Sequence, residues 1–378
     1  MRLAVLSVLA AAVAAGTLEA QDASRLSIDR IFASRDFVSA PAPSVHWLKD
    51  GQSYVDVRRA EGGGADIVRV NVVTGETTVL APASALVDER GERIAVENLS
   101  LSADESKALL FHNSVRVWRQ NTRGVYHVID FRTRKVMPVA TITTPGTGAS
   151  SATDTARDPY LGKSPTFLAG GLQSGAVDST LQMFAKFSPD GRAVAFVQGN
   201  DLWVTDLATG RARRLTNDGS DDIINGTTDW VYEEELGLSD AFRWSPDSRR
   251  IAYWRFDQSA VPAFPMVDEM GTYPSVGVLR YPKAGYPNSR VKVGVIDLGA
   301  GAVADGHAAS GAVPATRWLE AGPDTGQYIA RMEWAGPDSL VVQRLPRKQD
   351  RVDVLMLSAA TGKGRTVLTE RDSAYVDV

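Results

Sequence analysis

The 378-residue chain contains no cysteine and only four histidines. Without cysteine it can form neither a disulfide nor a thiolate metal site, and it has no thiol nucleophile. Lys and Arg number 41 against 45 Asp and Glu, for a net charge of −4. A mildly acidic chain lacks the basic surface that nucleic-acid binding requires. His and carboxylate spacings typical of metal sites are also absent, so we expect neither a metal nor a cofactor.

The sequence also lacks the Gly-x-Ser-x-Gly motif that carries the nucleophile of α/β-hydrolases. None of the four histidines follows a candidate Ser and Asp in the order of a hydrolase triad. They lie in or near predicted strands, where ordinary structural roles are the simplest interpretation: His46, His112, His127 and His307. We therefore expect no catalytic residue within the chain.

Long hydrophobic runs are absent except at the start of the chain. Arg2 precedes an apolar run from Leu3 to Ala15, and Ala20 is a plausible last residue before cleavage. This pattern predicts a signal peptide over residues 1–20. The run of about 13 residues is too short to span a bilayer, which needs about 20. We expect an exported protein without a membrane span, and the absence of cysteine favours a bacterial periplasmic or secreted location.

Helical periodicity is nearly absent, and a short motif recurs in its place. A hydrophobic strand start is followed by a turn rich in Asp, Gly, Pro and Ser, as in Trp244-Ser245-Pro246-Asp247. The aspartates of the five copies are Asp50, Asp104, Asp190, Asp247 and Asp338. Successive differences between these positions are 54, 86, 57 and 91. A period of about 55 residues, lengthened twice by insertions, is typical of four-stranded propeller blades.

The sequence therefore predicts an all-β fold, an incomplete β-propeller of about five to six blades with no α/β-hydrolase domain. A β-sandwich is the alternative, but it gives no reason for the repeated turn. The two insertions, Thr143 to Thr180 and Ala300 to Ala312, are rich in small residues and predict long loops.

An acidic triplet, Glu233 to Glu235, follows the segment Asp229-Trp230-Val231-Tyr232. A run of like charges is most often a solvated surface. Here the preceding residues are apolar and favour burial, which would place the carboxylates beside apolar mass. Carboxylates in such surroundings bind a cationic ligand more strongly than carboxylates in bulk water.

The segment Asp-Trp-Val-Tyr-Glu-Glu-Glu resembles the double-Glu motif of the dipeptidyl peptidase IV family, within the prolyl oligopeptidase class of serine peptidases. The resemblance implies that a short helical segment of the propeller projects Glu234 and Glu235 into an interior cavity. There they would clamp the free α-amine of a peptide, with Glu233 as the flanking residue. Such a clamp admits only two residues before the catalytic centre, which accounts for the release of X-Pro or X-Ala dipeptides.

A second resemblance lies at Val117-Trp118-Arg119-Gln120. The family has a Trp-Arg pair there, which implies that Arg119 reaches the substrate carbonyl and braces the Glu pair. The plain alternative is a surface arginine at a strand edge. Three further segments resemble parts of the family. Leu26–Phe32 resembles the mature start of bacterial members, and Arg280–Gly285 and Gln343–Arg347 resemble propeller segments with structural roles.

Complete family members have eight blades followed by an α/β-hydrolase domain. We therefore expect residues 21–378 to be a propeller truncated before that domain. The implied partners are peptides with a free N-terminus, the missing hydrolase domain and a second copy of the complete protein. The alternative function is a non-catalytic periplasmic propeller that acts as a binding or scaffold module.

Overall fold

The computed structural model describes residues 26–39, 45–117, 119–140, 180–299 and 313–378. The chain divides into two compact units, Met1–Ser44 and Val45–Val378. In the first unit, the short helix α2 spans Ile28–Phe32 and begins at Ser27, whose side chain accepts a hydrogen bond from the Arg30 backbone N–H. The predicted signal peptide and most of both predicted long loops lie outside the described residues.

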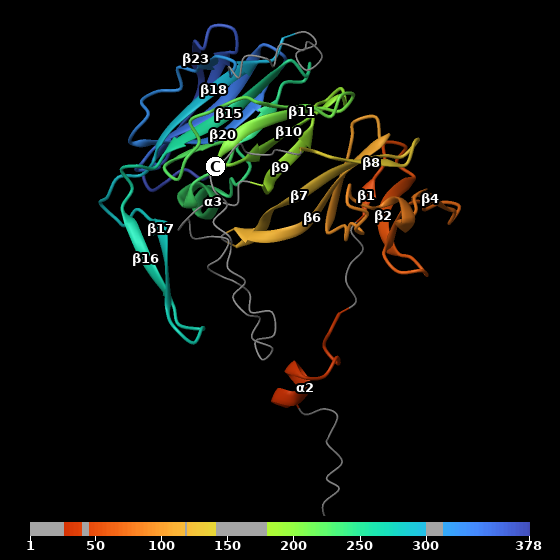
Figure 1. Cartoon of the computed structure of the whole chain (residues 1–378). Coiled ribbons are helices and arrows are strands. Elements are labelled where there is room, and N and C mark those ends of the chain that lie inside the picture. Colours follow the sequence, from red (N-terminus) through yellow and green to blue (C-terminus); the bar gives the residue numbers. More distant parts are fainter. Residues whose placement is uncertain (1–25, 40–44, 118, 141–179, 300–312) are drawn as a thin grey trace, which may run out of the picture. The chain divides into compact units, whose positions relative to one another are not determined.

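The second unit is built almost entirely from antiparallel strands (Figure 1). The first sheet pairs β1 (His46–Trp47), β2 (Ser53–Arg59), β3 (Ala65–Asn71) and β4 (Thr77–Ala81), followed by the 3-10 helix η1 (Ala83–Ala85). The second set contains β5 (Asn98–Leu101), β6 (Lys107–Val117), β7 (Gln120–Asp130) and β8 (Lys135–Pro138). The third contains β9 (Gln182–Phe187), β10 (Ala193–Gln198), β11 (Asp201–Asp206) and β12 (Ala212–Arg214). A short pairing of β7 with β9 joins the second and third sets into one sheet.

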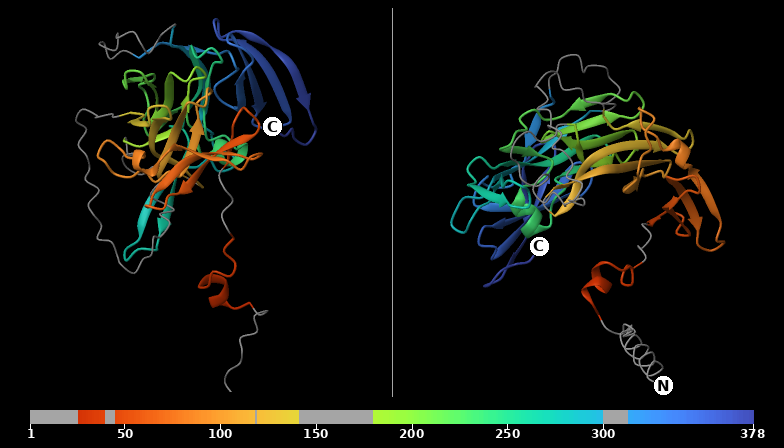
Figure 2. Two further views of the ribbon diagram at one scale, coloured as in Figure 1. Left: turned by 90° about the vertical axis from the view of Figure 1, so that its right-hand side faces the viewer. Right: turned by 60° about the horizontal axis from the view of Figure 1, so that its bottom comes forward.

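The fourth sheet has a short helix between two of its strands. It comprises β13 (Ile223–Asn225), β14 (Phe242–Trp244), β15 (Arg250–Asp257), β18 (Arg290–Asp297) and β19 (Thr316–Trp318), with helix α3 (Trp230–Leu236) between β13 and β14. The fifth contains β20 (Gln327–Trp334), β21 (Ser339–Pro346), β22 (Arg351–Ser358) and β23 (Gly364–Arg371). The sheets follow one another in the order of the sequence (Figure 2). The all-β prediction is confirmed, and the described residues form five blade-like units.

Each of the five repeated turns connects two strands that pair with each other: β1 with β2, β5 with β6, β9 with β10, β14 with β15, and β20 with β21. In the copies at Asp104, Asp190 and Asp247, the serine two residues earlier donates a 2.6 Å hydrogen bond to the aspartate. The same serine oxygen accepts the backbone N–H five residues later, as at Arg250. These bonds close the turn locally, which explains why the motif is visible in the sequence.

Consecutive blades share hydrophobic cores. Strand β6 alternates between two of them, because Leu110 packs with the first sheet and Leu109 packs with the third. Strand β15 does the same with Tyr253 toward the third blade and Trp254 toward the fifth. A strand that buries both faces in this way needs a sheet on each side, as in a propeller.

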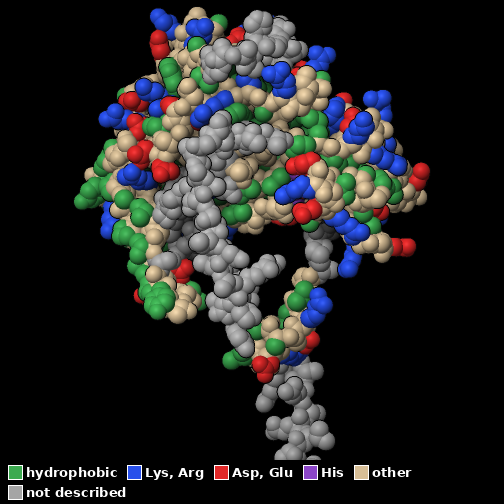
Figure 3. All heavy atoms as spheres, in the orientation of Figure 1, with side chains coloured by type: hydrophobic (Ala, Val, Ile, Leu, Met, Phe, Trp, Pro, Cys, Tyr) green, Lys and Arg blue, Asp and Glu red, His purple; other side chains and the backbone are tan. Residues whose placement is uncertain are grey.

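One hairpin stands apart from the blades. Strands β16 (Ala263–Asp268) and β17 (Ser275–Arg280) pair only with each other. They project from the sheets in Figure 1, and Figure 3 shows hydrophobic side chains gathered there. Exposed side chains on this hairpin and its tip include Val267, Met270 and Tyr273.

Candidate functional site

Helix α3 lies between β13 and β14, two short strands of the fourth sheet. Strands β13 and β14 both pair with β15, at Ile224↔Phe256 and Phe242↔Tyr253, so they occupy the same edge of that strand. A bridge between Thr227 and Asp240 closes the base of the excursion that carries the helix. The helix is thus presented from a fixed base rather than from a free loop.

The sequence itself sets both ends of helix α3. Asp229 is the N-cap, and its side chain accepts a 3.0 Å hydrogen bond from the Tyr232 backbone N–H. Gly237 ends the helix in the left-handed region at a φ of 60°, where a side chain would be strained. The Leu238 N–H then bonds back to the Tyr232 carbonyl at 3.0 Å. A helix of seven residues is thereby capped at both ends.

One side of the helix is anchored in the core. Val231, Tyr232 and Leu236 are buried in the cluster shared by the fourth and fifth blades. The Tyr232 hydroxyl accepts a 2.8 Å hydrogen bond from the Ile329 backbone N–H. Arg331 donates to the Leu236 carbonyl, also at 2.8 Å. These contacts fix the rotation of the helix and leave the three glutamates on its remaining surface.

Two further contacts fix the N-terminal end of helix α3. Ser289 donates a 2.6 Å hydrogen bond to Asp229, whose burial raises the pKa of its carboxyl. The Trp230 ring meets the Tyr281 ring edge-on at a centroid distance of 4.5 Å. Tyr281 belongs to Arg280–Gly285, one of the segments that resemble the family. The helix is therefore supported by the connection between β17 and β18, which carries both Tyr281 and Ser289.

Arg119 reaches the helix from the second blade. It lies in the turn between β6 and β7, and its Nε donates to Glu234 Oε1 at 2.6 Å across 115 residues of sequence. The arginine side chain is 76% exposed, whereas that of Glu234 is 17% exposed. Pairs this exposed contribute about 0–1 kcal/mol to stability. The contact therefore positions the two groups without adding much to the stability of the fold.

Glu233 occupies a less exposed place beside the same turn. Its carboxylate accepts a hydrogen bond from the Arg119 backbone N–H, while its Oε1 atom is buried without a hydrogen-bond partner among the described residues. Burial and the neighbouring Glu234 charge together raise the pKa of Glu233 from 4.5 to about 7. Near neutral pH this carboxyl is thus close to half protonated.

Glu235 is exposed, and it makes no hydrogen bond or ion pair within the described ranges. The structure thus brings Arg119 together with Glu234, and adds Glu233. Glu235 lies next to them in sequence with its carboxylate in solvent. Nothing in the sequence marked Glu233 as a partner of the hairpin turn, because the two segments are far apart along the chain.

Two of the four histidines form a buried pair on the β6–β7 hairpin. His112 Nε2 lies 2.9 Å from His127 Nδ1, and His127 Nε2 lies 3.1 Å from Glu89 Oε2. Burial lowers the pKa of His112. In the described part of the chain, no serine hydroxyl bonds to either ring. The arrangement is that of a satisfied polar pair in a sheet, as the sequence suggested for these histidines.

Comparisons with known proteins identify the family of the chain. The family model described as "Dipeptidyl peptidase IV (DPP IV) N-terminal region" matches residues 102–378. The chain belongs to this family. A probable dipeptidyl-aminopeptidase B of Aspergillus oryzae is 27% identical over 359 residues, covering 89% of this chain and 35% of that protein. A probable dipeptidyl peptidase 4 of Neosartorya fischeri is 28% identical over 345 residues, covering 89% of this chain and 38% of that protein.

The fold is also found in a solved relative. The crystal structure of Porphyromonas gingivalis dipeptidyl peptidase 4 matches with a TM-score of 0.72 at 24% identity, covering 93% of this chain and 43% of that chain. This dipeptidyl peptidase IV family region spans about a third of the length of the curated relatives it matches. No helix within the described ranges has the length and apolar character needed to cross a membrane.

Proposed function

We propose that this chain binds the free N-terminal amine of peptide substrates for a serine dipeptidyl aminopeptidase that releases X-Pro or X-Ala dipeptides. In this proposal Glu234 and Glu235 accept hydrogen bonds from the substrate ammonium. Arg119 bonds the substrate carbonyl and braces Glu234. The nucleophile, base and orienting acid belong to an α/β-hydrolase domain outside this chain.

The observation that supports the proposal most is the 2.6 Å contact between Arg119 and Glu234. It joins two segments that the family resemblance singled out independently. The planar guanidinium can bond a carboxylate and a carbonyl together, and most of it is exposed to a ligand. An ammonium has three donors, so two adjacent carboxylates can fix its position.

The attraction between the substrate ammonium and a carboxylate is strong enough to fix where the N-terminus of a peptide binds. A unit charge pair at about 4 Å gains about 4 kcal/mol at an effective dielectric constant of about 20. Glu235 is free of ion pairs in the described structure, so its carboxylate is available to share the ammonium with Glu234. An acetylated N-terminus has no positive charge and gains none of this attraction.

The test uses a polypeptide that carries this chain together with the hydrolase domain of the family. We expect Glu234→Gln to lower kcat/KM for Gly-Pro amide substrates by about 30-fold or more, as when a charge partner costing about 2–5 kcal/mol is lost. Glu370→Gln, an exposed carboxylate-to-amide change on β23, is the matched control. Unchanged hydrolysis by Glu234→Gln and Glu235→Gln would refute the clamp. Amine binding without any hydrolysis would instead favour a scaffold role.

The proposal includes export to a periplasm or the medium through a cleaved signal peptide over residues 1–20. N-terminal sequencing of the protein from a bacterial periplasmic fraction tests it, with a start near Gln21 expected. The homodimer expected for the complete protein is tested by light scattering.

A further inference from the structure

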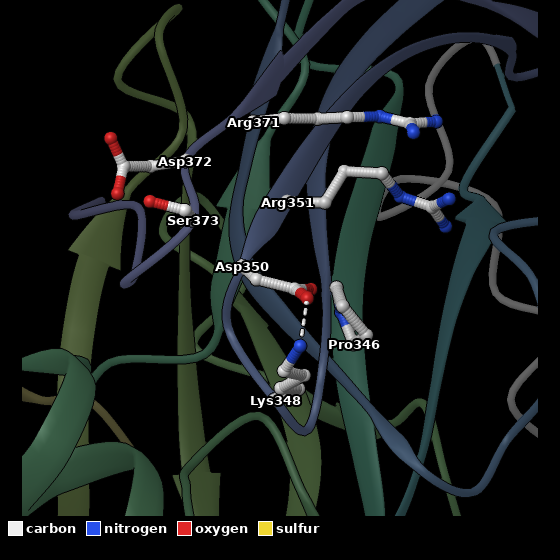
Figure 4. Close-up of a pocket in the computed structure, with 7 residues that line it drawn as sticks. All are labelled: Pro346, Lys348, Asp350, Arg351, Arg371, Asp372 and Ser373. Atoms are coloured by element: carbon white, nitrogen blue, oxygen red, sulfur yellow. Dashed lines mark ion pairs between the residues drawn. The ribbon is translucent and has the colours of Figure 1, made fainter.

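A hollow of about 560 Å³ opens on the fifth blade (Figure 4). It lies where the loop from β21 to β22 approaches the end of β23. Three of its lining residues carry a positive charge and two a negative one, so the lining has a net charge of +1: Lys348, Arg351 and Arg371 against Asp350 and Asp372. None of the residues of the amine site lines it.

Two of the cations lie directly opposite each other on neighbouring strands. Arg351 begins β22, Arg371 ends β23, and the two are register partners. Residues in this relation have Cβ atoms about 5 Å apart, and like charges there repel each other. Figure 4 shows both side chains extended in the same direction from the two strands. An anion between the two groups would relieve the repulsion.

The carboxylate nearest to Arg351 is already engaged. Asp353 accepts from Arg344 Nη2 at 2.9 Å and from Thr369 Oγ1 at 2.8 Å. Its ion pair with Arg351 is longer, at 3.2 Å from Nη2. The Nε of Arg351 is buried without a hydrogen-bond partner, and Arg371 has no ion-pair partner in the described structure. The buried Nε of Arg351 thus lacks an acceptor, which is unfavourable, and the exposed guanidinium of Arg371 has no protein acceptor in the described structure.

The other charged residues that line the hollow do not supply acceptors for the two arginines. Lys348 and Asp350 pair with each other at 2.9 Å. In Figure 4 the Asp372 carboxylate and the Ser373 hydroxyl point to the side away from the guanidinium groups. No carboxylate that lines the hollow therefore forms an ion pair with either arginine in the described structure.

We propose that Arg351 and Arg371 form a binding site for a tetrahedral oxyanion of the phosphate class. Each guanidinium offers a planar pair of donors, and such pairs match phosphate oxygens in bidentate fashion. A carboxylate has two oxygens and matches one such fork. A phosphate dianion has enough oxygens and charge to serve both arginines at once.

The experiment is calorimetric titration of the full chain with inorganic phosphate near neutral pH and low salt. We expect a single saturable site whose Kd rises by about tenfold or more in Arg371→Gln, since a lost charge-assisted bidentate contact has at least this effect. Arg371→Lys keeps the charge but loses the fork, and should recover only part of the affinity. The matched control is Arg365→Gln, on the same exposed strand but opposite Met356, which should bind phosphate like the unchanged protein.

Two further titrants identify the ligand at constant ionic strength. Acetate should bind about tenfold more weakly than phosphate or not at all, because it can satisfy only one guanidinium. Phenyl phosphate that binds more tightly than phosphate would identify a phosphorylated molecule as the ligand, and equal binding would identify free phosphate. The proposal is overturned by the absence of saturable phosphate binding, by equal affinity for acetate, or by an equal loss in Arg365→Gln.

Discussion

Replacing Glu233 by Gln should make the stability of the chain less dependent on pH. In the folded protein the pKa of Glu233 is raised from 4.5 to about 7 by burial and by the charge of Glu234. A carboxyl with a raised pKa binds a proton more tightly in the folded state than in the unfolded state. Its contribution is therefore fully present below about pH 4.5 and is lost as the pH rises toward about 7.

The size of the effect follows from the two pKa values. Their difference corresponds to about 3 kcal/mol against the ionised form in the folded state. Glu233 is only partly buried, and screening by solvent reduces this to about 1–2 kcal/mol. Gln retains an oxygen that accepts the Arg119 N–H and carries no charge beside Glu234, so Glu233→Gln avoids this loss.

Urea unfolding followed by tryptophan fluorescence measures the difference. At about pH 8 we expect Glu233→Gln to be more stable than the unchanged chain by about 1–2 kcal/mol, and at about pH 4.5 the two should differ little. Glu235→Gln, at an exposed neighbouring position, should show no such trend with pH. A stability difference for Glu233→Gln that stays constant across this range would refute the reasoning.

Three further predictions concern helix α3 and its contact with the hairpin. A double-mutant cycle of Arg119→Gln and Glu234→Gln should give a coupling free energy of unfolding of about 1 kcal/mol or less, because the arginine is largely exposed. A coupling several times larger would show that the contact contributes substantially to the stability of the fold. Tyr232→Phe should destabilise the chain by about 1–3 kcal/mol in urea unfolding, because the buried Ile329 N–H loses its acceptor; an unchanged midpoint would show that the bond has no net effect. Gly237→Ala should lower the unfolding free energy by about 1 kcal/mol, since alanine is strained at a φ of 60°. A neutral or stabilising result in thermal unfolding would mean that the helix can end in another conformation.

Features that depend on neighbouring residues were accessible from the sequence. The turn at Ser245 and Asp247 is closed by bonds within six residues, so its recurrence revealed the blades. The ends of helix α3 likewise follow from Asp229 and Gly237, which lie beside it. Family resemblance, rather than any local pattern, linked Arg119 to the acidic segment.

Features that depend on register or distant packing were not accessible. Arg371 faces Arg351 only because a β-bulge between Val354 and Leu355 shifts the pairing of β22 with β23. A shift of one residue moves every later side chain to the other face, and no residue type announces it. The pairing of Glu233 with the hairpin turn was hidden for a related reason, because the turn belongs to the second blade and helix α3 to the fourth.

The 115-residue separation of Arg119 and Glu234 also constrains the order of events during synthesis. At about 5–20 residues per second, the ribosome delivers the arginine about 6–23 s before the glutamate. A hairpin forms within microseconds, so β6 and β7 can pair long before the acidic helix exists. Until then the cation at the tip of the hairpin has no carboxylate from this helix, and its contact with Glu234 forms only after the fourth blade has joined the third.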